Sequence, residues 1–230
     1  MLVFAQEVQR LTSRSKRPPQ AGRRSASTLP LNQDINGQAM PKATEAHVYQ
    51  IKVTLEGIKP PIWRRLLVSS TISLKDFHEI LQTAIGWTDS HLHQFEARGE
   101  VYGVPDLDLG VTTKNEARVR LADVLIREKD AMRYEYDFGD GWTHKIVLER
   151  AFPHSGDVVV PSCVAGKRAC PPEDCGGIWG YEEFLRAVRD PAHPEHEEML
   201  EWIGGSFDPE HFDAVEISRW LAPRKRGPRA

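Results

Sequence analysis

The chain has few cysteines and no long apolar run. Its 230 residues include three cysteines, and no apolar stretch is long enough to cross a membrane. An odd and low cysteine count does not support a disulfide framework, so we expect a reducing, cytoplasmic setting. The first residues lack the charged start, apolar core and small-residue cleavage site of a signal peptide. These absences argue against membrane-spanning and disulfide-rich secreted proteins.

Two sets of catalytic motifs are also missing. Residues 137–139 read Asp-Phe-Gly, like the metal-binding triplet of protein kinases, but no Gly-rich phosphate loop or His-Arg-Asp loop accompanies them. The chain is therefore not a kinase. A basic recognition helix and a serine-recombinase signature are absent as well, and the sequence contains no internal repeat.

Charge is distributed unevenly along the chain. Residues 1–45 hold seven Lys/Arg and three Asp/Glu, and residues 222–230 hold four Lys/Arg and no acid. Residues 46–221 therefore carry 19 Lys/Arg and 30 Asp/Glu, a net charge of −11. An acidic body does not attract phosphates, whereas basic tails do so in a salt-dependent way. We expect any contact with nucleic acid to involve the tails alone.

The patterning predicts three regions. Residues 1–45 lack a hydrophobic period and are predicted to be a disordered basic tail, with Met40 as an alternative translation start. Residues 46–221 are predicted to form a single domain, and residues 222–230 form a second basic tail.

Within this domain, strands are predicted before helices. Alternating apolar residues indicate strands near 48–55, 62–68 and 91–98, with a helix from Ser73 to Gly86 after the second strand. A short helix is expected at 121–126 before a central hairpin, and residues 157–180 are too irregular for a regular element. Three helical patterns follow, near 181–188, at 194–203, and in a helix opened by Asp208-Pro209. This order predicts an α+β fold with a largely antiparallel β-sheet and a C-terminal group of three helices.

The central hairpin has two candidate registers. A two-residue loop at Asp140-Gly141 would place charged and apolar residues on the same face. A three-residue loop, 139–141, pairs Phe138 with Trp142 and Tyr136 with His144, which gives one apolar face. We adopt the second register, which places Phe138, Trp142 and His144 inward and leaves Asp137 and Asp140 exposed.

Several separated motifs carry a family resemblance. They are Ile62-Trp63-Arg64-Arg65, Gly86-Trp87, His91 to Phe95, Tyr134 to His144, Pro171 to Gly177, Gly180-Tyr181, and Phe207 to Glu210. Over about 48–221 the chain resembles the plasmid Ri ORF-three-like family, whose members are sometimes labelled TnpR-type passenger proteins of an insertion element. The resemblance implies a cytoplasmic, mostly bacterial, single-domain α+β protein associated with mobile elements. It implies no catalytic mechanism.

Histidines and cysteines are the candidate metal ligands. His91 and His93 share a strand face and His144 lies on the inward face of the hairpin, so they can converge on a divalent metal ion if the strands are neighbours. The alternative is that each histidine packs against a tyrosine or a backbone carbonyl. Cys170 and Cys175 are further candidates, although the chain has no Cys-x-x-Cys knuckle.

Four carboxylates are candidates for chemistry or recognition. Asp140 at the hairpin tip and Glu173 and Asp174 in a stiff Pro-Pro-Glu-Asp loop are the catalytic candidates, and Asp137 joins them as a ligand or partner surface. The alternative for Asp140 is a turn residue, and for the loop an ordered cover over the sheet.

Three functions follow from these candidates. The first is a non-enzymatic binding or accessory module of mobile elements, which meets a protein partner through loop 171–177 and the hairpin tip. The second is a metal-dependent hydrolase or nuclease, which requires the tip, the loop and His91 or His93 to lie together. The third is a DNA-binding protein that acts through its basic tails.

Overall fold

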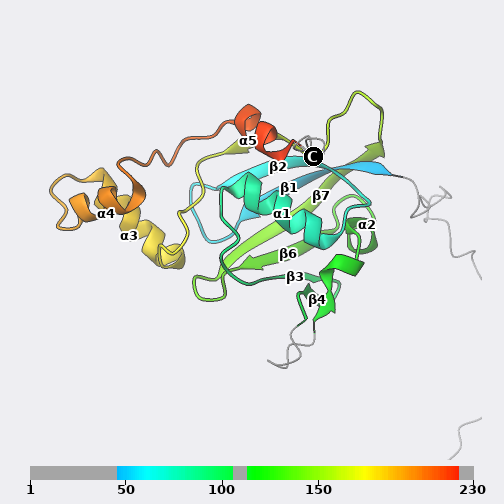
Figure 1. Ribbon diagram of the computed structural model, residues 1–230, viewed down its shortest axis with the longest axis horizontal. Helices are drawn as coiled ribbons and strands as arrows, with labels where there is room; N and C mark the ends of the chain where they lie inside the picture. Colours follow the sequence, from blue (N-terminus) through cyan, green and yellow to red (C-terminus); the bar gives the residue numbers. More distant parts are fainter. Residues whose placement is uncertain (1–45, 106–112, 223–230) are drawn as a thin grey trace, which may run out of the picture. The chain divides into compact units, whose positions relative to one another are not determined.

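The protein is built on one eight-stranded sheet (Figure 1). The computed structural model describes residues 46–105 and 113–222, which belong to the compact unit Lys42–Ala230. The strand order is β5-β4-β3-β6-β7-β1-β2-β8, and all neighbours are antiparallel except β4 and β5. The strands are β1 (His47–Leu55), β2 (Trp63–Ser69), β3 (His93–Ala97), β4 (Glu100–Gly103), β5 (Lys114–Asn115), β6 (Ala131–Tyr136), β7 (Trp142–Pro153) and β8 (Ser162–Lys167).

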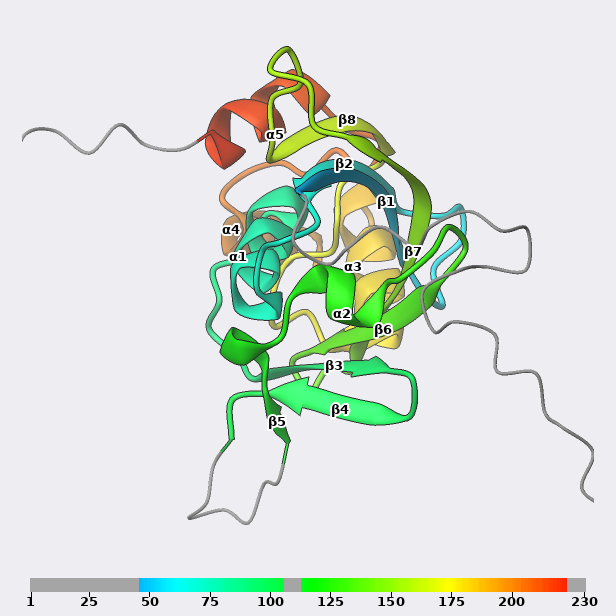
Figure 2. The same cartoon turned by 90° about the vertical axis from the view of Figure 1, so that its right-hand side faces the viewer.

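Helices cover one face of this sheet. In Figure 2 the strands run from β8 at the top to β5 at the bottom, and the sheet bends around α1 (Leu74–Ile85) and α2 (Leu121–Val124). A 3-10 helix, η1 (Glu116–Arg118), precedes α2. This mostly antiparallel sheet with separate helices confirms the predicted α+β fold. In the part of the chain that the structure describes, no helix is long and apolar enough to span a membrane.

Helix α1 forms where the sequence predicts it because its signals are local. The Ser73 hydroxyl accepts from the Asp76 amide at 3.0 Å, and the Asp76 carboxylate accepts from the Ser73 amide, which completes a capping box. Gly86 ends the helix at φ 95°, a left-handed conformation that glycine adopts without strain. The apolar stripe packs on the sheet through Leu74, Phe77, Leu81, Ala84 and Ile85.

The register of the central hairpin differs from the prediction. Tyr136 pairs with Trp142, and Tyr134 pairs with His144, so each partner is two residues away from the predicted one. A shift of two keeps every side chain on its predicted face, because strands alternate with a period of two. His144 and Trp142 are therefore buried as expected, while the turn lengthens to residues 137–141.

The lengthened turn reverses two assignments at the tip. Phe138, predicted to point inward, is 50% exposed, and Asp137, predicted to be exposed, is 8% exposed. Asp137 adopts φ 55°, and its Oδ1 accepts from the amides of Gly139 at 2.9 Å and Asp140 at 3.3 Å. The carboxylate thus folds back over the turn to bond its free amides, and the next side chain is turned outward.

The C-terminal region departs from prediction at two points. Residues 157–180 contain strand β8, which pairs with β2 although its sequence does not alternate. The helices are α3 (Gly177–Arg189), α4 (His196–Ile203) and α5 (Ala214–Leu221). The last helix does not open at Asp208-Pro209; it begins after Asp213, whose carboxylate accepts from the amides of Val215 and Glu216.

Helix α5 also protects the edge of the sheet. Strand β8 is an outer strand, and the Ser218 hydroxyl on α5 accepts from the Cys163 amide at 3.0 Å and donates to the Cys163 carbonyl at 2.9 Å. One side chain therefore satisfies an outward-facing donor and acceptor of the edge strand. At the opposite edge, β5 has only two residues.

Candidate functional site

The hairpin tip and the acidic loop lie against each other. Glu173 accepts from the Tyr136 hydroxyl at 2.5 Å through Oε1, and from the Thr88 amide at 2.9 Å and hydroxyl at 2.5 Å through Oε2. Asp140 Oδ2 accepts from the Gly176 amide at 3.2 Å. A Cβ on Gly177 would lie 2.5 Å from the Asp140 carbonyl oxygen, so the two segments pack at backbone distance.

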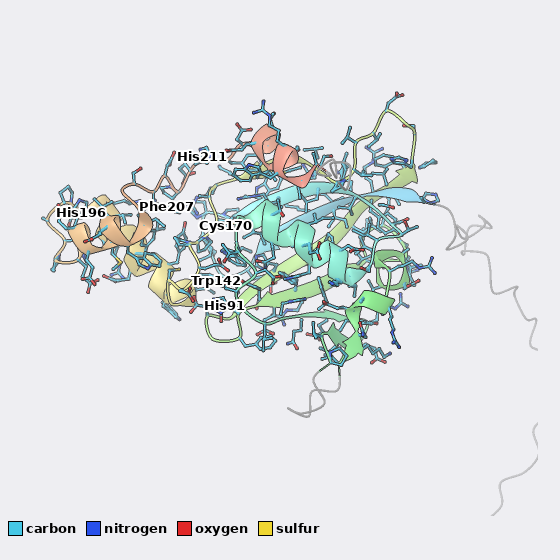
Figure 3. The ribbon with its side chains drawn as sticks, viewed as in Figure 1. His91, Trp142, Cys170, His196, Phe207 and His211 are labelled. Carbon is cyan, nitrogen blue, oxygen red and sulfur yellow. The ribbon has the colours of Figure 1, made fainter. Side chains whose placement is uncertain are left out.

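His91 joins this junction from the segment between α1 and β3. Its Nε2 lies 3.0 Å from Asp174 Oδ1 and 3.8 Å from Asp137 Oδ2. Figure 3 places His91 and Trp142 at the same end of the sheet. Three segments distant in sequence therefore contribute one imidazole and two carboxylates, and we call His91, Asp137 and Asp174 the junction cluster.

The junction cluster has the spacing of a metal site. Its donor atoms all lie within 4.8 Å of one another. Two donors that share a zinc ion at about 2.0–2.2 Å lie up to about 4.3 Å apart, which accommodates both His91 distances. The His91 Nε2 atom is buried and faces the Asp174 carboxylate at 3.0 Å. A divalent cation can take the place of a proton between this imidazole nitrogen and the two carboxylates.

Glu173 has a different role from its neighbour Asp174. Burial opposes ionisation of the Glu173 carboxyl, but the bonds from Thr88 and Tyr136 outweigh it and lower the Glu173 pKa. Burial and the bond to Glu173 raise the pKa of Tyr136. Because both Glu173 oxygens are already bonded, this predicted catalytic candidate serves to fix the loop on the sheet. The Asp174 side chain is 68% exposed and has room for a further ligand.

The three predicted histidines lie in separate surroundings. His93 Nε2 bonds Glu116 Oε2 at 2.8 Å, and its ring stacks on His78 at 3.5 Å. His144 is 2% exposed, lies 5.6 Å from the Tyr134 ring, and has no hydrogen bond at either nitrogen. Among the described residues, the donor clusters contain His91 and His93 separately, and neither contains His144.

The cysteines lie outside both donor clusters in the described residues. The Cys170 Sγ accepts a hydrogen bond from Arg64 Nη2 at 3.3 Å, and burial raises the pKa of the Cys170 thiol. Burial, with a smaller contribution from Asp140, raises the pKa of Cys175 to about 12. Both thiols are therefore protonated near neutral pH in the metal-free protein. All three cysteines are free.

The sequence analysis missed a second set of polar residues. His78 and Asp89 form, with His93, another group of donors within 4.8 Å, and Glu116 bonds His93 from outside that group. A signal for His78 was present, because it follows Phe77 and lies one turn after Leu74 on the buried face of α1. No local signal connects it to Asp89, which lies beyond the helix.

The family and two proteins that are similar to this chain are named for an unknown function or for their origin. Residues 47–216 match the family described as "Plasmid pRiA4b ORF-3-like protein". "Uncharacterized protein y4hQ" of Sinorhizobium fredii (strain NBRC 101917 / NGR234) is 46% identical over 162 residues, which cover 70% of this chain and 83% of that protein. A crystal structure titled "Protein of Unknown Function MM3350 from Methanosarcina mazei Go1" superposes with TM-score 0.68 at 39% identity, and covers 76% of this chain and 99% of that one.

Proposed function

The chain belongs to the plasmid pRiA4b ORF-3-like family. We propose that it is a metal-dependent hydrolase. The main support is the junction cluster, in which the buried His91 Nε2 is flanked by the carboxylates of Asp174 and Asp137. One imidazole and two carboxylates suit zinc or another divalent transition metal.

The number of donors supports catalysis over a purely structural ion. Structural zinc sites are closed by four protein ligands, whereas catalytic sites use three and leave a position for water. A metal in that arrangement lowers the pKa of its water and supplies hydroxide near neutral pH. Asp140 stands next to the cluster in the turn, with its Oδ2 bonded to the Gly176 amide. Hydrolysis of an ester or phosphoester would consume one water, whose hydroxide would join the acyl or phosphoryl group and whose proton would go to the leaving group.

Zinc titration of the purified protein tests this proposal. We expect one zinc ion per chain by calorimetry, and a His91→Ala variant that binds zinc about tenfold more weakly or worse. His211→Ala is the matched control, because His211 is 64% exposed on the segment before α5 and lies outside both donor clusters. Zinc-loaded protein should hydrolyse p-nitrophenyl acetate or bis-p-nitrophenyl phosphate, and His91→Ala should not.

Two results would contradict it in different ways. Equal zinc affinity of the wild-type protein and His91→Ala would show that His91 does not bind zinc and would contradict the metal site. Tight zinc binding through His91 with no turnover of either ester would reject the hydrolase and retain the site as a structural one.

A second candidate is a binding or accessory module carried by mobile elements. Trp179 favours it, since its side chain is 80% exposed in the first turn of α3, two residues beyond the acidic loop. An exposed tryptophan that follows an acidic loop in sequence has the composition of a protein-binding surface. The acidic groups there would meet basic residues of a partner.

The Trp179→Ala variant separates this candidate from the hydrolase. We expect a partner that co-purifies with the wild-type protein to be lost from Trp179→Ala and retained by Trp220→Ala, which removes a 59% exposed tryptophan on α5. Zinc binding should be unchanged in both variants. Retention of every co-purifying protein by Trp179→Ala would count against the module.

A further inference from the structure

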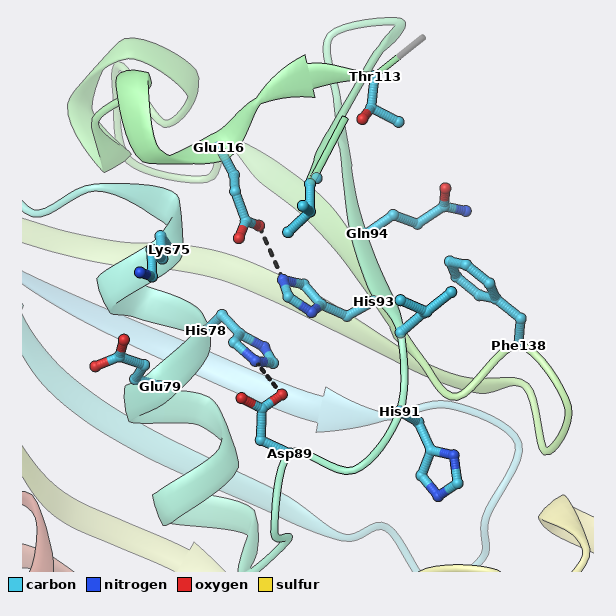
Figure 4. Close-up of a pocket in the computed structure, with 13 residues that line it drawn as sticks. Lys75, His78, Glu79, Asp89, His91, His93, Gln94, Thr113, Glu116 and Phe138 are labelled. Carbon is cyan, nitrogen blue, oxygen red and sulfur yellow. Dashed lines mark hydrogen bonds and ion pairs between the residues drawn. The ribbon is translucent and has the colours of Figure 1, made fainter. Parts of the chain in front are cut away.

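A pocket lies between α1, β3 and the segment around η1 (Figure 4). It lies beside the junction cluster but has its own polar groups. Its volume is about 330 Å³, the size of pockets that take small molecules. His78, His93, Asp89 and Glu116 lie at its inner end, and we call it the imidazole pocket. His91 lines it too, with its ring directed away from the other two histidines (Figure 4).

The two inner histidines are stacked, each with its own carboxylate. The rings of His78 and His93 are 3.5 Å apart with an interplanar angle of 5°. His78 Nε2 bonds Asp89 Oδ1 at 2.8 Å, and His93 Nε2 bonds Glu116 Oε2 at 2.8 Å. A metal ion lies close to the plane of each imidazole that binds it, so two parallel rings at this separation are poorly placed to share one ion. The remaining lining of the pocket therefore indicates what it can hold.

The charged residues that line the pocket favour a positively charged ligand. The pocket is lined by three carboxylates, Glu79, Asp89 and Glu116, and by one ammonium group, Lys75. Burial and the neighbouring His93 lower the pKa of His78, so this ring stays neutral near pH 7 and does not oppose a cation. The surrounding body, residues 46–221, has a net charge of −11. Both local and long-range fields favour a positive ligand over a negative one.

The outer wall of the pocket is apolar. It includes Leu92, Val104 and Phe138, which are 66%, 63% and 50% exposed. Phe138 presents an aromatic face to solvent at the rim, and such faces attract cations. Thr113 Oγ1 lines the same pocket, is buried and has no partner, so it is available to accept an N–H bond. Polar acceptors inside and an apolar rim outside suit an amphipathic molecule.

We infer that the imidazole pocket binds a small organic ammonium ion with an apolar substituent. The ammonium group lies at the inner end beside the Asp89 carboxylate, and the substituent contacts Phe138 and Leu92. The inference is independent of metal binding and of hydrolysis, because the groups that recognise the ammonium ion lie outside the junction cluster.

Three probes of one shape and different charge test it. Benzylamine, benzyl alcohol and benzoate are titrated separately into the full chain in buffer with EDTA, and the ring protons of His78 and His93 are followed by NMR. We expect saturable shifts with benzylamine, at least about fivefold weaker binding of benzyl alcohol, and no saturation with benzoate. Equal responses to all three, or no response of either histidine to benzylamine, would overturn the inference.

Variants locate the ligand. Asp89→Asn should reduce benzylamine affinity to that of benzyl alcohol, and Phe138→Ala should weaken both probes about threefold or more. Leu92→Ala removes a 66% exposed apolar side chain of the rim and should also weaken both probes, which keeps the test decisive if Asp89→Asn disturbs His78. Glu216→Gln removes a negative charge on α5, away from the pocket, and should leave the benzylamine affinity unchanged. If this variant loses as much affinity as Asp89→Asn, the effect comes from net charge and the site is contradicted.

Discussion

Replacing Arg64 by methionine is expected to lower the free energy of unfolding by about 3 kcal/mol or more. The Arg64 side chain is 4% exposed and donates from Nε to the Ala84 carbonyl at 3.0 Å. The Nη1 atom of Arg64 donates to the carbonyls of Trp63 at 3.0 Å and Lys167 at 3.2 Å. Ala84 lies in the last turn of α1, where carbonyls have no partner within the helix. Methionine fills a similar volume but removes the donor to the buried Ala84 carbonyl and to the partly buried carbonyls of Trp63 and Lys167.

Urea unfolding of the two neighbouring arginine variants measures this effect. Arg65 points to the opposite face of β2 and pairs with Glu149 at 2.6 Å, with side chains 30% and 23% exposed. Arg65→Met should cost less than about 1 kcal/mol, as exposed ion pairs do. Similar losses in Arg64→Met and Arg65→Met would show that the buried guanidinium has no special importance.

The second large effect is a loss of stability in acid caused by His144. Burial lowers the pKa of His144 from 6.5 to about 4 in the folded protein. Between these pH values the unfolded chain binds more protons than the folded one, so the free energy of unfolding falls as the pH falls. The contribution is on the order of 3 kcal/mol, and it is fully present above pH 6.5 and lost near pH 4.

His144→Phe isolates this contribution, because phenylalanine keeps an aromatic ring beside Tyr134 and Trp87 without a titrating nitrogen. Unfolding measured from pH 7 to pH 4 should show a flatter dependence for this variant. His78 retains part of the slope, since burial lowers its pKa too. A profile for His144→Phe that runs parallel to the wild-type profile would assign the acid sensitivity to other groups.

Local signals explain which parts of the fold were predictable. Both ends of α1 were foreseen because Ser73, Asp76 and Gly86 act within one turn of the helix. The face that each hairpin strand buries was also predictable, since side chains alternate along a strand with a period of two. The residues that pair across the two strands were not predictable, because a register shift of two leaves the hydrophobic pattern unchanged. Strand β8 was not predicted because it forms by pairing with β2, and its own residues show no alternation of apolar and polar side chains.

The candidate site was predictable only in pieces. The sequence singled out the hairpin tip, the acidic loop and the histidines, but their grouping depends on contacts between distant segments. His91 meets Asp174 across the junction, whereas His93, two residues later, meets Glu116. Residues of similar chemistry and adjacent position thus belong to different donor groups. Neither spacing nor composition distinguishes them.

The bond between Ser218 and Cys163 has a consequence for association between molecules. An unpaired outer strand is a template on which a second chain can add a strand and extend the sheet. Here one hydroxyl occupies both outward-facing backbone groups of Cys163, and α5 stands where an added strand would have to lie. At the other margin, β5 offers only two residues for pairing. The Ser218 side chain therefore opposes strand addition at the Cys163 position of β8, and β5 as described is too short to be an extended template.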